Sequence, residues 1–275
     1  QNQRDTVIKI DDVVINENRF NTPISKQNRN VYVIDQETIA KLPARTIQEV
    51  LQYANGVDLR QRGPFGSQAD ISIDGGSFEQ TVVLLNGTKI IDSQTAHNML
   101  NLPLPVEAIE RIEIIRGPAA RIYGINSLTG AINIITKKPT RSGFMISSYA
   151  GSNFEKDSED SGKTFKGRGV QFGAVLSKEK HQHSLFASHD ASNGYRYNTG
   201  FENNKLLYQG RFQINPSNEI EALFGYTKNG FGANGFYAAP GDKNSDEVVQ
   251  TTLASIQAKS QLSASWTLMS RLSYR

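Results

Sequence analysis

From about residue 140 onward, the sequence repeats short segments in which apolar residues occupy every second position. The clearest of these segments lie near residues 170–176, 206–214, 220–226 and 266–274. Successive side chains of a strand point to opposite faces, so this period predicts strands with one apolar face. Their length is close to the roughly 10 residues that a tilted membrane-spanning strand needs. The stretch 248–260 alternates poorly, and we predict a strand there from its position alone.

The connections between these segments differ in length in a regular order. Short turns are expected at 178–182, 215–218 and 260–265, and long polar loops at 153–167, 190–204 and 229–247. Short turns at one end and long loops at the other are typical of a membrane β-barrel. A soluble all-β domain stays open on the strand pattern alone, because single strand signals are weak.

Composition excludes several other classes of protein. The longest apolar runs, such as Val82–Leu85, fall far short of the roughly 20 residues of a membrane-spanning helix, and mean hydropathy is −0.45. The chain has no cysteine, which excludes disulfides and thiolate metal sites. A net charge of +3 from 30 basic and 27 acidic residues gives no basic face for nucleic acid.

The first half has a different organisation. Residues 1–30 are polar and are expected to form an extended or disordered tail. Residues 31–138 are expected to form a compact α+β domain with loops at 60–69 and 88–101. We predict its strands at 31–34, 57–59, 70–73, 81–85, 111–115 and 131–136, and its helices at 36–41, 47–54 and 106–109.

No catalytic arrangement is apparent. The sequence contains no G-x-S-x-G, no H-E-x-x-H and no glycine-rich phosphate loop. We therefore expect a protein that is not an enzyme.

Several stretches of the first half together resemble one family. They are VYVIDQETI, IQEVLQYANGVDLR, ISIDGGSFEQTVVLLNGTKI and LPVEAIERIEIIRGPAARIYGINSLTGAINIITKKP. In this order they resemble the plug domain of TonB-dependent outer-membrane receptors over nearly its whole length. The most specific part is Glu107–Glu113, followed by Arg116-Gly117-Pro118 and Tyr123-Gly124.

The resemblance implies a fold class and a domain division. Residues 31–139 would be an α+β plug domain, a small mixed sheet with short helices. Residues 140–275 would be the first strands of an antiparallel transmembrane β-barrel. Plugged barrels have about 22 strands, whereas about seven are expected here, so we expect the chain to be part of a longer one.

The resemblance also implies a location and an energy source. The protein would lie in the outer membrane of a Gram-negative bacterium, with Gln1 following a removed signal peptide. The tail at 1–30 would carry a TonB box at Asp11, Asp12, Val13, Val14 and Ile15. An extended β-branched segment can add as a strand to the sheet edge of a partner, here the inner-membrane TonB complex. Residues 6–10 form a competing register for the box.

Within the superfamily, the sequence is most similar to cobalamin receptors. The leader at 11–20 and the loop at 236–242 carry this similarity, while Asp74 stands where the family usually has an arginine. The implied function is TonB-dependent import of a scarce, large nutrient, most simply cobalamin. Alternatives are a ferric-siderophore or haem receptor, with His97 as a haem ligand. A soluble or passive β-barrel binding protein is an alternative of another class.

The candidate ligand contacts follow from this topology, because the two long plug loops can face outward. They are Arg62, Phe65, Ser67 and Gln68 in the first loop and Ser93, Gln94, Thr95, His97 and Asn98 in the second. Phe236 and Tyr237 of the third outer loop could pack on a bulky ligand or a surface lipoprotein partner, or could anchor the loop to the barrel rim. For each single residue the alternative is an ordinary solvated loop whose glycines satisfy turn geometry.

Metal binding has weaker signals. Asp242, Asp246 and Glu247 could supply oxygen ligands for a structural calcium ion, although a solvated acidic loop explains them better. His181 and His183 lie two residues apart, where a polar turn is a better explanation than a metal site. We expect no other cofactor.

Overall fold

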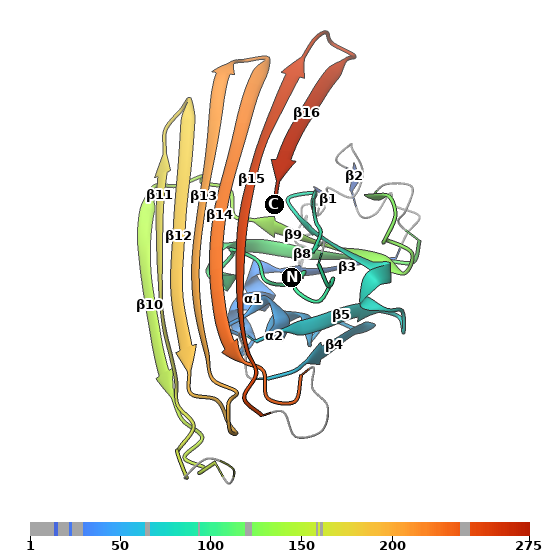
Figure 1. Cartoon of the computed structure of the whole chain (residues 1–275). Coiled ribbons are helices and arrows are strands. Elements are labelled where there is room, and N and C mark those ends of the chain that lie inside the picture. The colour runs from blue at the N-terminus through green and yellow to red at the C-terminus, as the bar shows by residue number, and fades with distance from the viewer. Residues whose placement is uncertain are drawn as a thin grey trace, which may run out of the picture.

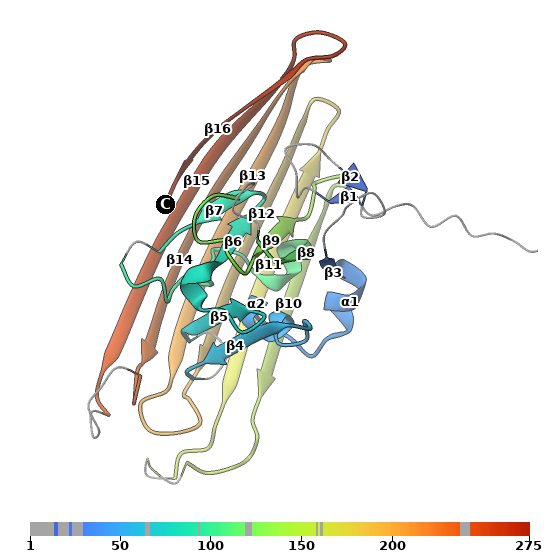
Figure 2. The same ribbon diagram turned by 90° about the vertical axis from the view of Figure 1, so that its right-hand side faces the viewer.

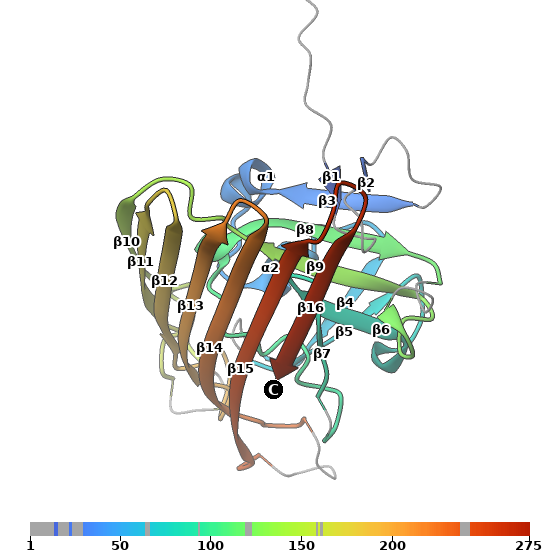
Figure 3. The same ribbon diagram turned by 90° about the horizontal axis from the view of Figure 1, so that it is seen from above.

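The computed structural model describes residues 14–15, 22–23, 30–63, 67–92, 94–118, 123–157, 159, 162–236 and 243–275. It has two parts, an α+β domain in the first half and a broad antiparallel sheet in the second (Figure 1). The α+β domain lies against one face of the broad sheet, whose strands stand in a row along one side of it (Figure 3).

A five-stranded mixed sheet organises the α+β domain. Its strands, in spatial order, are β3 (Val31–Asp35), β8 (Ile109–Arg116), β9 (Gly130–Thr136), β6 (Thr81–Leu85) and β7 (Thr88–Ile90). Strands β6 and β9 run parallel, and the other neighbouring pairs are antiparallel. A separate hairpin joins β4 (Val57–Gln61) to β5 (Ala69–Ile73).

The sheet contains one strand that the sequence pattern assigns to a loop. Residues 88–90 form β7, because the Asn86-Gly87 turn folds them back onto β6. Both turn residues have positive φ, 50° and 73°, as a tight hairpin turn requires.

Two short helices begin at capped positions. Helix α1 (Gln36–Lys41) follows Asp35, whose carboxylate accepts a hydrogen bond from the Thr38 amide at 2.8 Å. Helix α2 (Ile47–Leu51) follows Thr46, which forms a capping box with its third residue. Both caps place the helix starts where the sequence predicts them.

Helix α1 ends at Lys41 as predicted, but the other two predicted helices end earlier than expected. Helix α2 stops at residue 51 and not at 54, because the chain turns there toward Gly56, whose φ of 75° is incompatible with a helix. The expected helix at 106–109 is a single 3₁₀ turn, η3 (Val106–Ala108), and the chain then enters β8. A similar turn, η2 (Phe78–Gln80), precedes β6.

The central strands β6 and β9 are buried along their whole length. Burial on both faces is usual for parallel strands that are covered on each side. The carboxylate of Glu113 on β8 is also fully buried, and it is compensated by Arg111 at 2.9 Å and the Asn133 amide at 3.0 Å. A buried charge is tolerated when it is paired in this way.

The broad sheet contains seven antiparallel strands in sequence order. They are β10 (Gly143–Gly151), β11 (Gly167–Ser177), β12 (His181–Ser192), β13 (Phe201–Asn215), β14 (Asn218–Gly232), β15 (Asp246–Gln261) and β16 (Thr267–Tyr274). Short turns lie at one end of the sheet, and the longer loops 152–166, 193–200 and 233–245 lie at the other. This confirms the predicted asymmetry. The strands reach further into the long-loop end than predicted, and the poorly alternating stretch 248–260 lies within β15, the longest strand.

The two faces of the broad sheet have different surroundings. On one face Phe186, Leu207 and Leu253 are buried against the core of the α+β domain, and Met145 packs beside them. The register joins these four into one row across the sheet. The opposite face exposes the apolar residues predicted by the two-residue period, including Val170, Phe172, Leu206, Phe224, Leu268 and Leu272.

Gly225 completes the buried row and allows the two parts to approach closely. It lies between Leu207 and Leu253 in the register. A Cβ at this position would lie 2.4 Å from Cγ of Pro103 in the α+β domain. The contact therefore depends on the missing side chain.

The N-terminal strands and the β4–β5 hairpin lie toward opposite ends of the broad sheet. The short strands β1 (Val14–Ile15) and β2 (Thr22–Pro23) pair with each other and lie nearer the short-turn end, whereas the β4–β5 hairpin lies nearer the long-loop end (Figure 2). Among the described residues, no helix has the length and apolar character needed to cross a membrane.

Candidate functional site

Asp70 joins several of the predicted contact residues at the long-loop side of the α+β domain. Its carboxylate lies 3.2 Å from Nη2 of Arg62 and 2.6 Å from Nδ1 of His97. The side chain of Asp70 is only 10% exposed, so solvent screens these interactions weakly. The His97 ring also packs on Phe78, with centroids 4.5 Å apart. The two loops predicted from the sequence therefore meet at one carboxylate.

Sequence reasoning did not select Asp70. It stands inside a short strand whose other residues are mostly apolar, ADISI. A charged residue at a buried strand position needs a partner. The presence of an aspartate in this apolar strand was therefore the one sequence feature that could have identified it.

Arg62 also connects the α+β domain to a loop of the broad sheet. Its Nη1 donates a hydrogen bond of 2.8 Å to the carbonyl oxygen of Phe236 in the loop 233–245. The Phe236 side chain is 7% exposed and packs with Phe201 and Phe231. In this position Phe236 holds the loop against the sheet, the second of the two roles considered for it.

The loops 193–200 and 233–245 hold each other in place. Asn234 donates a hydrogen bond of 2.6 Å to the Tyr197 carbonyl, and Asn198 donates one of 2.8 Å to the Ser245 carbonyl. The Tyr197 hydroxyl reaches the side chain of Asn244 at 2.7 Å. These hydrogen bonds hold the two loops together next to Arg62.

The second predicted loop is shaped by Asp92. Its carboxylate accepts hydrogen bonds from the amides of Gln94 at 3.2 Å and Asn98 at 3.1 Å, and from the Thr95 hydroxyl at 3.1 Å. Burial opposes ionisation, but these hydrogen bonds prevail and lower the pKa of Asp92. Gln94 and Thr95 are exposed, whereas Asn98 turns inward.

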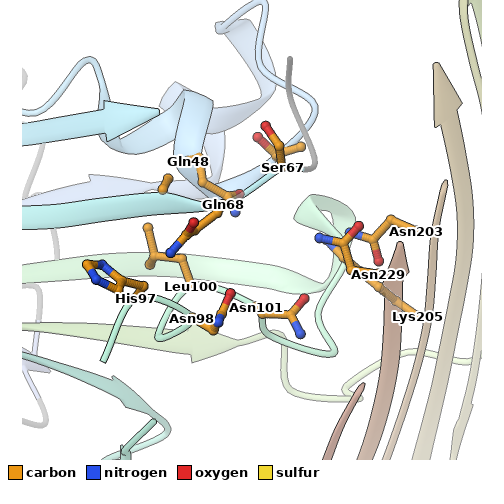
Figure 4. Close-up of a pocket in the computed structure, with 12 residues that line it drawn as sticks. Gln48, Ser67, Gln68, His97, Asn98, Leu100, Asn101, Asn203, Lys205 and Asn229 are labelled. Atoms are coloured by element: carbon orange, nitrogen blue, oxygen red, sulfur yellow. The ribbon is translucent and has the colours of Figure 1, made fainter. Parts of the chain in front are cut away.

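A polar pocket lies between the α+β domain and the broad sheet, and Figure 4 shows its lining. The residues around it are Thr46, Gln48, Ser67, Gln68, Ala69, His97, Asn98, Leu100, Asn101, Asn203, Lys205 and Asn229. Six of these twelve carry a carboxamide, two carry a hydroxyl, and none carries a carboxylate. Such a lining offers many neutral donors and acceptors.

Three pocket residues come from the broad sheet and were missed by sequence reasoning. Asn203 and Lys205 lie on β13 and Asn229 on β14, at positions that face the α+β domain. The two-residue period gives their face of the sheet, but it does not show which residues on that face lie close to the loops of the α+β domain.

Charged residues, several of them half-buried, lie at the boundary between the two parts. Burial raises the pKa of the Glu107 carboxyl, and the negative charge of Asp190 on β12 adds to this shift. Burial lowers the pKa of the neighbouring Lys137 amine. Arg45 lies over the ring of Tyr149 on β10, 4.1 Å from its centroid, a cation–π contact between the two parts.

Asp74, the departure from the family pattern, has a partner in Arg116. The guanidinium Nε donates a hydrogen bond of 3.0 Å to the Asp74 carboxylate, and this bond holds the pKa of Asp74 below its usual range. Arg116 of the Arg116-Gly117-Pro118 stretch therefore pairs with Asp74, the residue at the position where the family usually has an arginine.

The predicted calcium ligands are not brought together. Asp246 and Glu247 are consecutive residues of β15, so their side chains point to opposite faces. Asp242 lies outside the described residues, and within these residues no group of three acidic or histidine side chains could hold a metal.

Other predicted residues fall in different places. Phe65, Ser93, Tyr237 and residues 11–13 of the TonB box lie outside the described residues, and Val14 and Ile15 form β1. His181 and His183 were expected in a polar turn. They are instead residues of strand β12, because the turn is confined to 178–180.

Comparison with known proteins gives a consistent result. Residues 23–131 match the family described as TonB-dependent Receptor Plug Domain. The vitamin B12 transporter BtuB of Vibrio vulnificus is 32% identical over 148 residues, which is 54% of this chain and 24% of that protein. The vitamin B12 transporter BtuB of Vibrio cholerae is 28% identical over 202 residues, which is 73% of this chain and 33% of that protein. The chain thus spans about a quarter to a third of these curated relatives.

Solved structures share the fold at low sequence identity. The ferric citrate transporter FecA in its unliganded form superposes with a TM-score of 0.72 at 17% identity, covering 86% of this chain and 38% of that one. The siderophore receptor PirA from Acinetobacter baumannii superposes with a TM-score of 0.65 at 21% identity, covering 88% and 39%.

Proposed function

We propose that the chain, whose residues 23–131 match the plug domain of TonB-dependent receptors, forms part of an outer-membrane transporter of this family that imports cobalamin. The α+β domain is then the plug, and the seven-stranded sheet is one side of the barrel wall. Cobalamin enters from the long-loop side, and TonB supplies the energy from the periplasmic side.

The lining of the polar pocket carries this proposal. Cobalamin is a bulky ligand whose corrin ring bears several amide side chains. Carboxamides pair well with other carboxamides, since each offers two donor hydrogens and an acceptor oxygen. The six carboxamides between plug and wall fit this chemistry, and the relatives include vitamin B12 transporters. The space that they enclose is only about the size of one water molecule, so cobalamin would reach these groups after the loops around the pocket move apart.

The second candidate ligand, a ferric siderophore, is favoured by the names of the structural neighbours. Many siderophore complexes are anionic and need cationic partners. Arg62 and His97 already bind Asp70, so accepting an anion there would require it to compete with that carboxylate. The pocket itself contributes one ammonium group, Lys205. The balance of charge therefore supports the neutral, amide-rich ligand.

The energy-coupling segment is proposed at Asp11–Ile15. Its last two residues, Val14 and Ile15, pair with Thr22 and Pro23 in an isolated two-strand ladder. A segment with so few pairs is suited to rearrange and add to the sheet edge of TonB. Its position nearer the short-turn end supports a periplasmic location for that end.

Uptake by living cells tests the proposal. Cells that lack their own cobalamin receptor would express the gene and be given radiolabelled cobalamin, with and without functional TonB. We expect surface binding in both strains and accumulation only with TonB. Absence of accumulation in the TonB-containing strain would refute the proposed function.

The coupling segment is tested in the same assay. Val14→Pro removes a backbone N–H and should abolish accumulation while leaving surface binding intact. Val14→Ala is the matched control, because it keeps the N–H, and it should retain accumulation. Loss of surface binding in Val14→Pro would mean that β1 is a structural strand and not a coupling segment.

A further inference from the structure

The two histidines at the start of β12 form a pair that the proposed import does not use. Phe186 of the same strand faces the plug, so His181 and His183, at odd positions, lie on the outward face with the exposed Leu185. Nδ1 of His181 lies 3.2 Å from Nε2 of His183. Their rings are near the short turn at 178–180, and His181 is exposed.

The separation of the two nitrogens suits a shared metal ion. A tetrahedral zinc ion holds nitrogen ligands at about 2.0–2.1 Å, which puts two such ligands roughly 3.3 Å apart. The two rings are tilted by 56°, with centroids 5.3 Å apart, and belong to one rigid strand. For one ion to take both nitrogens, the hydrogen bond between them is given up and each ring turns so that its lone pair points at the ion.

Tyr208 on the neighbouring strand orients the second imidazole. Its hydroxyl lies 2.8 Å from Nδ1 of His183, so the remaining nitrogen of that ring faces His181. Metal-ligating histidines usually have their other ring nitrogen fixed by a hydrogen bond of this kind. Gly210 lies opposite His183 in the register, and a Cβ there would come within 2.8 Å of the Tyr208 hydroxyl. The glycine therefore leaves room for this arrangement.

We propose that His181 and His183 bind a divalent transition-metal ion, with Tyr208 as the orienting residue and water completing the coordination. Imidazole ligands suit Cu²⁺, Ni²⁺ and Zn²⁺, and the usual order of affinity puts Cu²⁺ first. The pair lies on the opposite face of the sheet from the plug pocket, so its test does not depend on which nutrient is imported.

Copper binding to the untagged receptor, expressed from its whole gene and purified in detergent, tests the proposal. Titration calorimetry would give the affinity, and electron paramagnetic resonance of bound Cu²⁺ would count its nitrogen ligands. We expect one ion with two nitrogen ligands, bound more tightly than Zn²⁺. His181→Asn or His183→Asn should remove the two-nitrogen signal, and Tyr208→Phe should weaken binding about 10-fold.

His189 provides the matched control. It lies on the outward face of the same strand, but its Nδ1 is 2.8 Å from the Asn204 side chain and not near another histidine. His189→Asn should leave copper binding unchanged, and circular dichroism would verify that each variant keeps its sheet. Equal copper binding by the wild type and the His181→Asn/His183→Asn double variant would overturn the proposal, as would an equal loss in His189→Asn.

Discussion

Replacing Asp70 with asparagine removes the one negative charge that joins the two plug loops to an outer loop of the wall. The carboxylate accepts hydrogen bonds from Arg62 and His97, and Arg62 in turn binds the Phe236 carbonyl. Asparagine has nearly the same shape, so the change acts on charge and hydrogen bonding and leaves packing intact.

The magnitude follows from the two hydrogen bonds. A hydrogen bond to a charged group contributes about 1.5–3 kcal/mol, compared with about 0.5–1.5 kcal/mol for a neutral one. The side chains of Arg62 and His97 are 26% and 24% exposed and that of Asp70 is 10% exposed, so solvent screens both bonds weakly. Losing the charge from both bonds should cost about 2–3 kcal/mol, and each 1.4 kcal/mol corresponds to a tenfold change. Local opening of the loops should become about 30- to 140-fold more frequent.

Hydrogen exchange of the purified receptor, followed by mass spectrometry, measures this opening. The Arg62 amide donates to the Gln68 carbonyl at 3.1 Å and closes the first loop, and the Asn98 amide binds Asp92 in the second. Both amides should exchange faster in Asp70→Asn. Asp58→Asn, on the neighbouring strand and exposed, is the control and should leave exchange unchanged. Equal protection in Asp70→Asn and the wild type would refute the view that Asp70 holds the loops together.

Two further perturbations test the contact between plug and wall. Gly225→Ala would place a methyl group 2.4 Å from Cγ of Pro103, and this overlap should reduce the free energy of unfolding by about 1–3 kcal/mol, as measured by denaturant titration. Gly230→Ala is the control, because its added methyl group would lie 3.9 Å from the nearest neighbour, and it should leave the free energy of unfolding unchanged. The raised pKa of Glu107 means that its carboxyl holds a proton more tightly in the folded receptor than in the unfolded chain. The free energy of unfolding should therefore fall as pH rises above 4.5, the ordinary pKa of a glutamate, and should level off above the raised pKa. Glu107→Gln should remove this part of the pH profile, and an unchanged profile would contradict the assignment.

Most of the fold could be predicted from local patterns. The two-residue period gave the strands of the wall and their outward faces, because one face must be apolar over the whole sheet. Caps such as Asp35 and Thr46 gave the helix starts. The predicted ends of strands were less accurate where they depend on tertiary contacts. Strand β7 was expected to be part of a loop, and β13 and β14 are longer than predicted, so the loops next to them are shorter.

The site was only partly predictable. Loop position identified Arg62 and His97, but nothing local shows that they meet at Asp70. The wall residues Asn203 and Asn229 reach the pocket only because of how the plug sits against the sheet, which is a long-range property. Sequence spacing also could not show that Phe236 turns inward or that strand β12 begins early enough to include His181 and His183.

Titration calorimetry of the purified whole receptor with cyanocobalamin tests the central proposal most directly, with a ferric siderophore and haem as competing ligands. We expect cyanocobalamin to bind at micromolar concentration or below, and Gln68→Leu or Asn203→Leu to weaken that binding because each removes a carboxamide from the pocket. Binding of the ferric siderophore or haem, with no heat from cyanocobalamin at micromolar concentration, would contradict the assignment of cobalamin while leaving the family and the fold intact.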